Sequence, residues 1–183
     1  MRRQLVGLLV LAALLFGVAA ATVPQGRASD QARAMPDGKA MVRTIQRYQR
    51  ATWRWQRLMG VRRTPSLRRY LRTRDITYKR HVLQQWRRRA IRARHRAHNP
   101  PHEAAWRCLQ RHEGRWDDRW DPYWGGLQMD RSFMQHYAPR HLLRRGWAHT
   151  WTPIEQMWVA ERALRAGRGF YPWPNTARLC GLL

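Results

Sequence analysis

Acidic residues are scarce in this chain of 183 residues, which has 11 Asp and Glu against 36 Lys and Arg and a formal net charge of +25. An ordinary cytosolic enzyme does not need such an excess of one sign, so the balance disfavours that class. The charge instead implies an anionic partner, which can be nucleic acid, a membrane surface or an acidic wall polymer. The sequence also lacks a Gly-rich phosphate loop and an internal repeat, so it does not predict a phosphate-loop nucleotide site or a repeat architecture.

Long apolar runs are missing except near the N-terminus. Arg2 and Arg3 precede an almost unbroken apolar run over 5–18, and the small residues 19–21 follow it. This order is typical of a signal peptide, and the run is shorter than the roughly 20 residues that span a bilayer comfortably. We predict a signal peptide over 1–21, with an uncleaved anchor as the alternative. Either one makes the rest of the chain secreted or associated with the cell envelope, which disfavours nucleic acid as the partner.

Cysteine is also scarce, because the chain has only Cys108 and Cys180. An even number of cysteines in an exported chain predicts one disulfide. The bond would close a loop of roughly 70 residues and stabilise the folded state by about 4 kcal/mol in the chain-entropy treatment. Two unrelated buried thiols are the alternative.

The middle of the chain is strongly basic. A linker over 22–40, small and polar in composition, precedes an Arg-rich segment over 41–101, where 19 Lys and Arg face one acid, Asp75, between 41 and 98. We predict helices over 39–59 and 76–97, and we expect the segment to bury little and to order only when bound, because its like charges repel. Its predicted partner is an anionic envelope polymer or a membrane surface, and a solvated spacer is the alternative.

Residues 102–183 hold the globular part, predicted to be mainly α. The pattern indicates helices over 103–113 and 132–137, with a short hairpin or turn in the Gly- and Pro-containing stretch 117–126. The clearest helix follows Thr152, since Pro153 suits its first position and Glu155 completes a capping box. Within it, we interpret Glu161 as a structural residue paired with Arg165 four positions later. Gly167 is its predicted stop.

Several short motifs follow one another in this part of the chain. In order they are Trp106, Cys108, Glu113-Gly114, Trp116, Tyr123, Gly125-Gly126-Leu127-Gln128, Ala160-Glu161-Arg162, Trp173 and Cys180. This series resembles the transglycosylase-like domain of resuscitation-promoting factors and related actinobacterial lysozyme-like proteins, over roughly residues 102–182. The resemblance implies a small lysozyme-like domain, α+β but dominated by helices, with a peptidoglycan cleft and a Cys108–Cys180 bridge.

The resemblance also implies roles for individual residues. Glu113 corresponds to the catalytic acid of the family, and Gln128 to the glutamine that faces the sugar. The nearby aromatic residues Tyr123, Trp124 and Trp116 are the other candidate substrate contacts, although Tyr123 and Trp124 are equally compatible with a place in the core. Two departures stand out. Gly114-Arg115-Trp116 follows the glutamate directly, without the family's serine and second glycine, and Phe133-Met134 replaces an expected Thr-Trp pair.

The implied chemistry is cleavage of the β-1,4 bond between MurNAc and GlcNAc, by a muramidase or a lytic transglycosylase. Such cleavage needs an acid that protonates the leaving oxygen and a group that stabilises the oxocarbenium-like transition state. The stabilising group is one of four nearby carboxylates or the N-acetyl group of the substrate; the carboxylates are Asp117, Asp118, Asp121 and Asp130.

No metal or cofactor is expected. His112-Glu113 begins like a zinc-protease motif, but Trp116 stands where the second histidine belongs. Two other functions stay open from the sequence. One is a non-catalytic peptidoglycan-binding protein, which the departure at 133–134 motivates. The other is a cationic membrane-active protein whose activity lies in residues 41–98.

Overall fold

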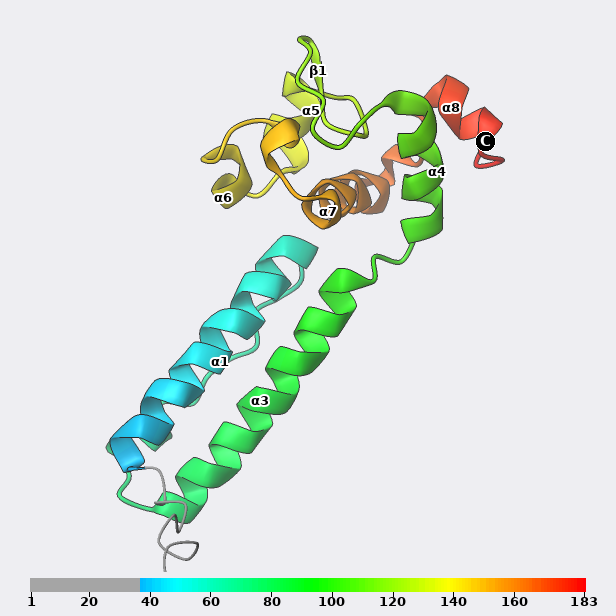
Figure 1. The fold of residues 1–183 in the computed structure, drawn as a ribbon. Coiled ribbons are helices and arrows are strands. Elements are labelled where there is room, and N and C mark those ends of the chain that lie inside the picture. The colour runs from blue at the N-terminus through cyan, green and yellow to red at the C-terminus, as the bar shows by residue number, and fades with distance from the viewer. Residues whose placement is uncertain (1–36) are drawn as a thin grey trace, which may run out of the picture. The chain divides into compact units, whose positions relative to one another are not determined.

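The computed structural model describes residues 37–183, so the predicted signal peptide and most of the predicted linker lie outside the described residues. The described part is mainly helical, as predicted, and has one antiparallel pair of two-residue strands (Figure 1). Within these residues, no helix is both long and apolar enough to span a bilayer. The helices are α1 Gly38–Met59, α2 Arg69–Arg72, α3 Ile76–His98, α4 Glu103–Glu113, α5 Arg131–Tyr137, α6 Arg140–Leu143, α7 Pro153–Ala163 and α8 Pro174–Leu179, and the strands are β1 Tyr123–Trp124 and β2 Met129–Asp130.

The Arg-rich segment forms a packed pair of helices. α1 and α3 lie side by side and run in the same direction, so both end next to α7 (Figure 1). Ile45, Tyr70 and Trp86 are each at most 3% exposed and form a core between them. The expectation that this segment buries little is therefore wrong. α1 also begins at Gly38, so residues 38–40, which the sequence predicts to be part of the linker, belong to this helix.

Small residues explain how so basic a segment packs. Ala90, Ala93 and Ala97 recur at helical spacing on α3 and are buried. They let the two helices approach closely while the arginines occupy the outer faces. This apolar stripe is hard to recognise in the sequence, because alanine adds little hydrophobicity against a background of arginine.

The chain returns between the two helices through an extended segment, residues 61–68. Three residues of α1 hold this segment in place. Their spacing of i, i+4 and i+7 puts them on one face of the helix. Gln49 donates to Ser66 Oγ at 2.6 Å, and Trp53 Nε1 donates to the Thr64 carbonyl at 2.8 Å. Gln56 bonds both the backbone N–H and the hydroxyl of Thr64. Side chains of α1 therefore supply the hydrogen bonds that a neighbouring strand would otherwise give this segment.

The centre of the C-terminal part is α7. Seven of its eleven residues are buried, including Met157 and Val159 at 0% exposure. The predicted capping box of Thr152 and Glu155 is present, with Pro153 at the first helical position. A π-helical turn, Leu164–Arg168, continues the helix to Gly167, whose positive φ of 85° breaks the helical conformation where the stop was predicted.

Two buried polar side chains of α7 hold the surrounding loops. Gln156 Oε1 accepts from the N–H of Gly126 at 2.9 Å, and its Nε2 donates to the carbonyls of Trp116 and Ala148. The Glu161 carboxylate accepts from Trp106 Nε1 at 2.8 Å and from the backbone N–H and ring of His102. The structural role of Glu161 is confirmed, but its side chain is not paired with Arg165.

The end of α7 joins the two long helices. Arg162 donates to the carbonyls of Arg57 and Leu58, and Arg165 donates to that of Met59, all in the last turn of α1. Trp158 Nε1 donates to the Ala97 carbonyl at the end of α3 at 2.7 Å. These side chains satisfy carbonyls that have no partner within their own helices, and the guanidinium charges suit the negative end of the α1 dipole. Arg165 therefore bonds α1 and the backbone carbonyl of Glu161, and not the Glu161 carboxylate.

We expect Gln156→Leu to lower the free energy of unfolding by about 3 kcal/mol, because it leaves a buried N–H and buried carbonyls without partners. Denaturant titration under oxidising conditions measures the change. Gln84→Leu, at an exposed position of α3, is the matched control and should leave stability nearly unchanged. Equal stability of the two variants would contradict the role given to Gln156.

The pKa of Glu155 gives a second prediction. Burial raises this pKa, but hydrogen bonds from Arg145 and from the backbone of Thr152 outweigh burial, so the pKa is lowered. A lowered carboxyl pKa contributes stability above the pKa of the unfolded chain, and the contribution disappears as pH falls through the folded pKa. Glu155→Gln should therefore cost about 1 kcal/mol at neutral pH and much less in acid. Thermal unfolding from neutral to acidic pH tests this, and a cost independent of pH would contradict it.

Candidate functional site

Glu113 ends α4, the first helix of the C-terminal part. Trp106 and Leu109 anchor this helix, because both are fully buried in the main core. The indole N–H of Trp106 donates to Glu161, which fixes the start of the helix against α7. The backbone under Glu113 is therefore rigid, while its side chain is only half-buried.

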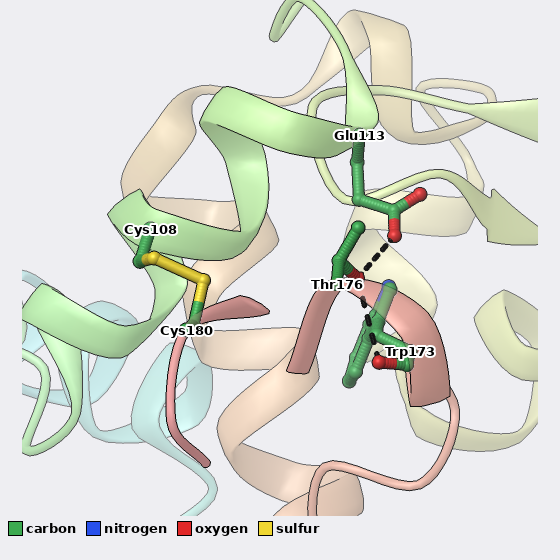
Figure 2. The surroundings of a disulfide bond; sticks show 5 residues. All are labelled: Cys108, Glu113, Trp173, Thr176 and Cys180. Carbon is green, nitrogen blue, oxygen red and sulfur yellow. Dashed lines mark hydrogen bonds between the residues drawn. A yellow bond between two sulfur atoms is a disulfide. The ribbon is translucent and has the colours of Figure 1, made fainter. Parts of the chain in front are cut away.

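A threonine from the last helix holds the Glu113 carboxylate. Thr176 Oγ1, on α8, donates to Glu113 Oε1 at 2.5 Å (Figure 2). Within the described part of the chain, no donor bonds the other oxygen, Oε2. One oxygen is thus oriented by the protein, and the second has no hydrogen-bond donor among the described residues. No sequence motif marks Thr176, because it lies 63 residues from its partner.

The Cys108–Cys180 disulfide is present, as predicted. It joins α4 to the end of α8 across a sequence separation of 72 residues (Figure 2). Cys180 follows Thr176 by four residues, and Glu113 follows Cys108 by five. The covalent bond therefore keeps together the two helices that carry Glu113 and its hydrogen-bond donor.

Gln128 lies against the residue that follows Glu113. A Cβ placed on Gly114 would be 3.0 Å from Gln128 Nε2 and 2.9 Å from Asp118 Oδ2, so the backbone there passes very close to both. Gln128 Nε2 donates to Asp118 Oδ2 and to the Gly125 carbonyl, each at 3.0 Å. The structure thus brings Gln128 and Asp118 next to the end of α4.

The predicted aromatic contacts divide into three cases. Trp116 is half-buried and packs over Gly126, where an added Cβ would be 2.7 Å from the indole. Tyr123 is 49% exposed at the start of β1. Trp124 is 6% exposed and packs against Trp147 with ring centroids 5.7 Å apart. Its proposed substrate contact is therefore wrong, because side chains alternate along a strand and β1 turns Trp124 into the core.

The four aspartates near Glu113 in the sequence have different hydrogen-bond partners and exposures in the structure. Asp130 accepts from the N–H of Phe133 and caps α5. Asp117 is paired with Arg115 at the surface, where the Arg115 hydrogen bond is the main cause that lowers its pKa. Asp121 is exposed and precedes a cis peptide bond to Pro122. Asp118, bonded to Gln128, is the candidate second carboxylate beside the end of α4.

Core packing accounts for the Phe133-Met134 departure. Met134 is fully buried, and its sulfur accepts from the N–H of Ala148. Phe133 packs against Trp173 and Tyr137, with ring centroids 5.5 Å and 4.8 Å away. Both side chains stabilise α5 against the core.

No family model, curated protein or solved structure matches the chain.

One group of metal-ligand types lies beside the site. Possible ligand atoms of Cys108, His112 and Cys180 lie within 4.8 Å of one another. The two sulfur atoms are bonded to each other in this structure, and it is the thiolate form of cysteine that binds metal ions. In the oxidised protein this group is therefore a disulfide with a histidine beside it.

We expect reduction of the disulfide to lower the free energy of unfolding by about 4 kcal/mol, because a long loop is released in the unfolded chain. Denaturation with and without a phosphine reductant measures this loss. The double variant Cys108→Ala/Cys180→Ala should show the same loss and no response to the reductant. A variant that still responds to the reductant would contradict the assignment of the effect to this bond.

Proposed function

We propose that this protein is an exported enzyme that cleaves peptidoglycan at the MurNAc–GlcNAc β-1,4 bond through a lysozyme-like domain in residues 102–183. The observation that supports this best is the half-buried Glu113 carboxylate, held through one oxygen by Thr176 beside Gly114, Asp118 and Gln128. The predicted signal peptide supports export to the cell envelope, where this substrate is found. The resemblance to the transglycosylase-like domain supports the choice of substrate.

Glu113 is the proposed general acid. When the carboxyl is protonated, its proton belongs on Oε2, because Oε1 already accepts the hydroxyl hydrogen of Thr176. This places the acidic hydrogen on the oxygen that is available to a ligand. Transfer of that proton to the glycosidic oxygen lets the leaving sugar depart as an alcohol. Thr176 is a positioning residue in this scheme, since it orients the acid and does not touch the bond.

Asp118 is the proposed second carboxylate. In a hydrolase it either activates a water molecule or stabilises the positive charge that develops on the sugar ring. If the N-acetyl oxygen of the substrate instead bonds C1 as the glycosidic bond breaks, the C6 hydroxyl then displaces it and gives its proton to the Glu113 carboxylate. The product is a 1,6-anhydro sugar, and Asp118 only orients Gln128. The products of the reaction distinguish these two routes.

Gln128 is the proposed sugar contact. Its Nε2 is occupied by Asp118 and Gly125, whereas its Oε1 accepts no hydrogen bond from the described residues. The amide therefore presents an acceptor, which suits a hydroxyl or N-acetyl N–H group of the glycan. Exposed Tyr123, which pairs with Asp130 across the two-stranded sheet, offers a ring for apolar contact with a sugar face.

A non-catalytic peptidoglycan-binding protein is the second candidate. The specific observation in its favour is that Met134 is buried in the core and half-buried Phe133 packs against it, so neither offers a hydroxyl group to a substrate. This candidate keeps the binding roles of Gln128 and Tyr123 but assigns Glu113 no proton transfer.

We expect Glu113→Gln to reduce glycan cleavage by about 100-fold or more, because the amide cannot supply the proton. Release of soluble fragments from purified cell walls measures the rate. Mass spectrometry of the fragments separates anhydro ends from reducing ends, which differ by one water. Glu103→Gln, at the start of the same helix, is the control and should retain full activity.

Binding to the walls should persist in Glu113→Gln, since the substitution keeps the size of the side chain. Equal cleavage by wild type and Glu113→Gln would refute the acid assignment. Wall binding without cleavage by wild type would favour the non-catalytic candidate.

A further inference from the structure

A large polar cavity lies far along the chain from Glu113. It has a volume of about 680 Å³ and is formed by α1 and residues 63–71. None of its lining residues belongs to the Glu113 site. Three arginines line it, namely Arg50, Arg63 and Arg68.

The walls of this cavity are fixed by hydrogen bonds. Gln49 is 4% exposed, and its two amide ends bond Tyr70 and Ser66 at 3.0 Å and 2.6 Å. Trp53 lines the cavity as well and holds the Thr64 carbonyl. These hydrogen bonds join the cavity walls to one another within the protein, and fixed walls lower the ordering cost of an interaction.

The charge around the cavity is of one sign. Arg50, Arg63 and Arg68 are exposed and bond no carboxylate among the described residues. A second hollow of about 270 Å³ is lined by Val61, Thr64 and three arginines of α3, namely Arg89, Arg92 and Arg96. Neither hollow has an acidic lining residue. Guanidinium groups pair with phosphate through two parallel hydrogen bonds, so this face suits a phosphate-bearing ligand.

Exposed apolar side chains accompany these arginines. Leu67 is 81% exposed, Val61 43% and Leu71 41%, all within the segment that connects α1 and α3 or at its end. Leu71 itself lines the larger cavity. A soluble phosphate polymer offers no apolar phase for these side chains, whereas the acyl boundary of a membrane does.

We propose that residues 61–72 bind an anionic phospholipid surface, with a headgroup phosphate in the cavity of Arg50, Arg63 and Arg68 and Leu67 among the acyl chains. This site is independent of the proposed glycan cleavage, because it uses none of the residues around Glu113. For the Arg-rich segment, the sequence predicts either an anionic envelope polymer or a membrane surface as partner. The proposal chooses the membrane and places the contact in residues 61–72.

The test uses the full chain with vesicles of phosphatidylcholine alone or mixed equally with phosphatidylglycerol. Arg50→Gln/Arg68→Gln should weaken binding to the mixed vesicles by about 30-fold, the effect of two surface cations at the membrane. Arg87→Gln/Arg94→Gln removes the same charge from the opposite side of α3, away from the hollow-lining arginines of that helix, and should weaken binding less than about threefold. Every variant keeps residues 1–36, so any contribution of that segment is common to all.

Leu67→Ser should weaken binding to the mixed vesicles by about tenfold, since it removes the apolar insertion. Leu179→Ser is the matched control, because Leu179 is 70% exposed on α8. Amide hydrogen exchange measured by mass spectrometry gives an independent readout: the mixed vesicles should protect residues 61–72 and leave α8, Pro174–Leu179, unaffected.

Three results would overturn the proposal. One is an equal loss of binding in the two double-arginine variants, which would indicate attraction by overall charge. Another is exchange in residues 61–72 that the mixed vesicles do not change. The third is protection of 61–72 by soluble polyphosphate together with full vesicle binding by Leu67→Ser, which would assign the cavity to a phosphate polymer.

Discussion

The burial of two polar side chains on α7 is the constraint on which the described structure depends. Gln156 and Glu161 are each at most 1% exposed, and such burial is tolerable only because their polar atoms find partners. Gln156 fixes the loop between α4 and β1 through Trp116 and the turn between β1 and β2 through Gly126, and Glu161 fixes the start of α4. α7 therefore positions the backbone before Glu113, at the start of α4, and the backbone after it, in the loop that follows α4.

The same helix anchors the basic helix pair. The last turns of α1 and α3 bring carbonyl groups and the negative ends of two helix dipoles to one place, which is unfavourable unless donors meet them. Arg162, Arg165 and Trp158 are those donors. Arginine thus has two roles in this chain: a few guanidinium groups satisfy carbonyls inside the structure, and many others remain at the surface, where their charge is available to an anionic partner.

The candidate site places a restrained carboxylate, that of Glu113, on a rigid backbone. The disulfide and the core hold α4 and α8 together, so the short bond from Thr176 to Glu113 costs little additional ordering. Asp118, Gln128 and Gly114 are similarly close because Gly114 has no side chain to separate them. The position after Glu113 therefore favours glycine for a steric reason, because a Cβ there would come too close to Asp118 and Gln128.

Local features were predictable from the sequence. The Thr152 capping box, the stop at Gly167 and the position of Glu113 at a helix end follow from residue types at short spacing, because capping and amphipathic burial act within a few turns. The disulfide follows instead from an even number of cysteines in a chain with a predicted export signal. Only the tertiary structure decided the parallel pairing of α1 and α3, the burial of Trp124, and the choice of Thr176 and Asp118 as neighbours of the site. Those outcomes depend on contacts between residues distant along the chain, for which a single sequence carries no periodic signal.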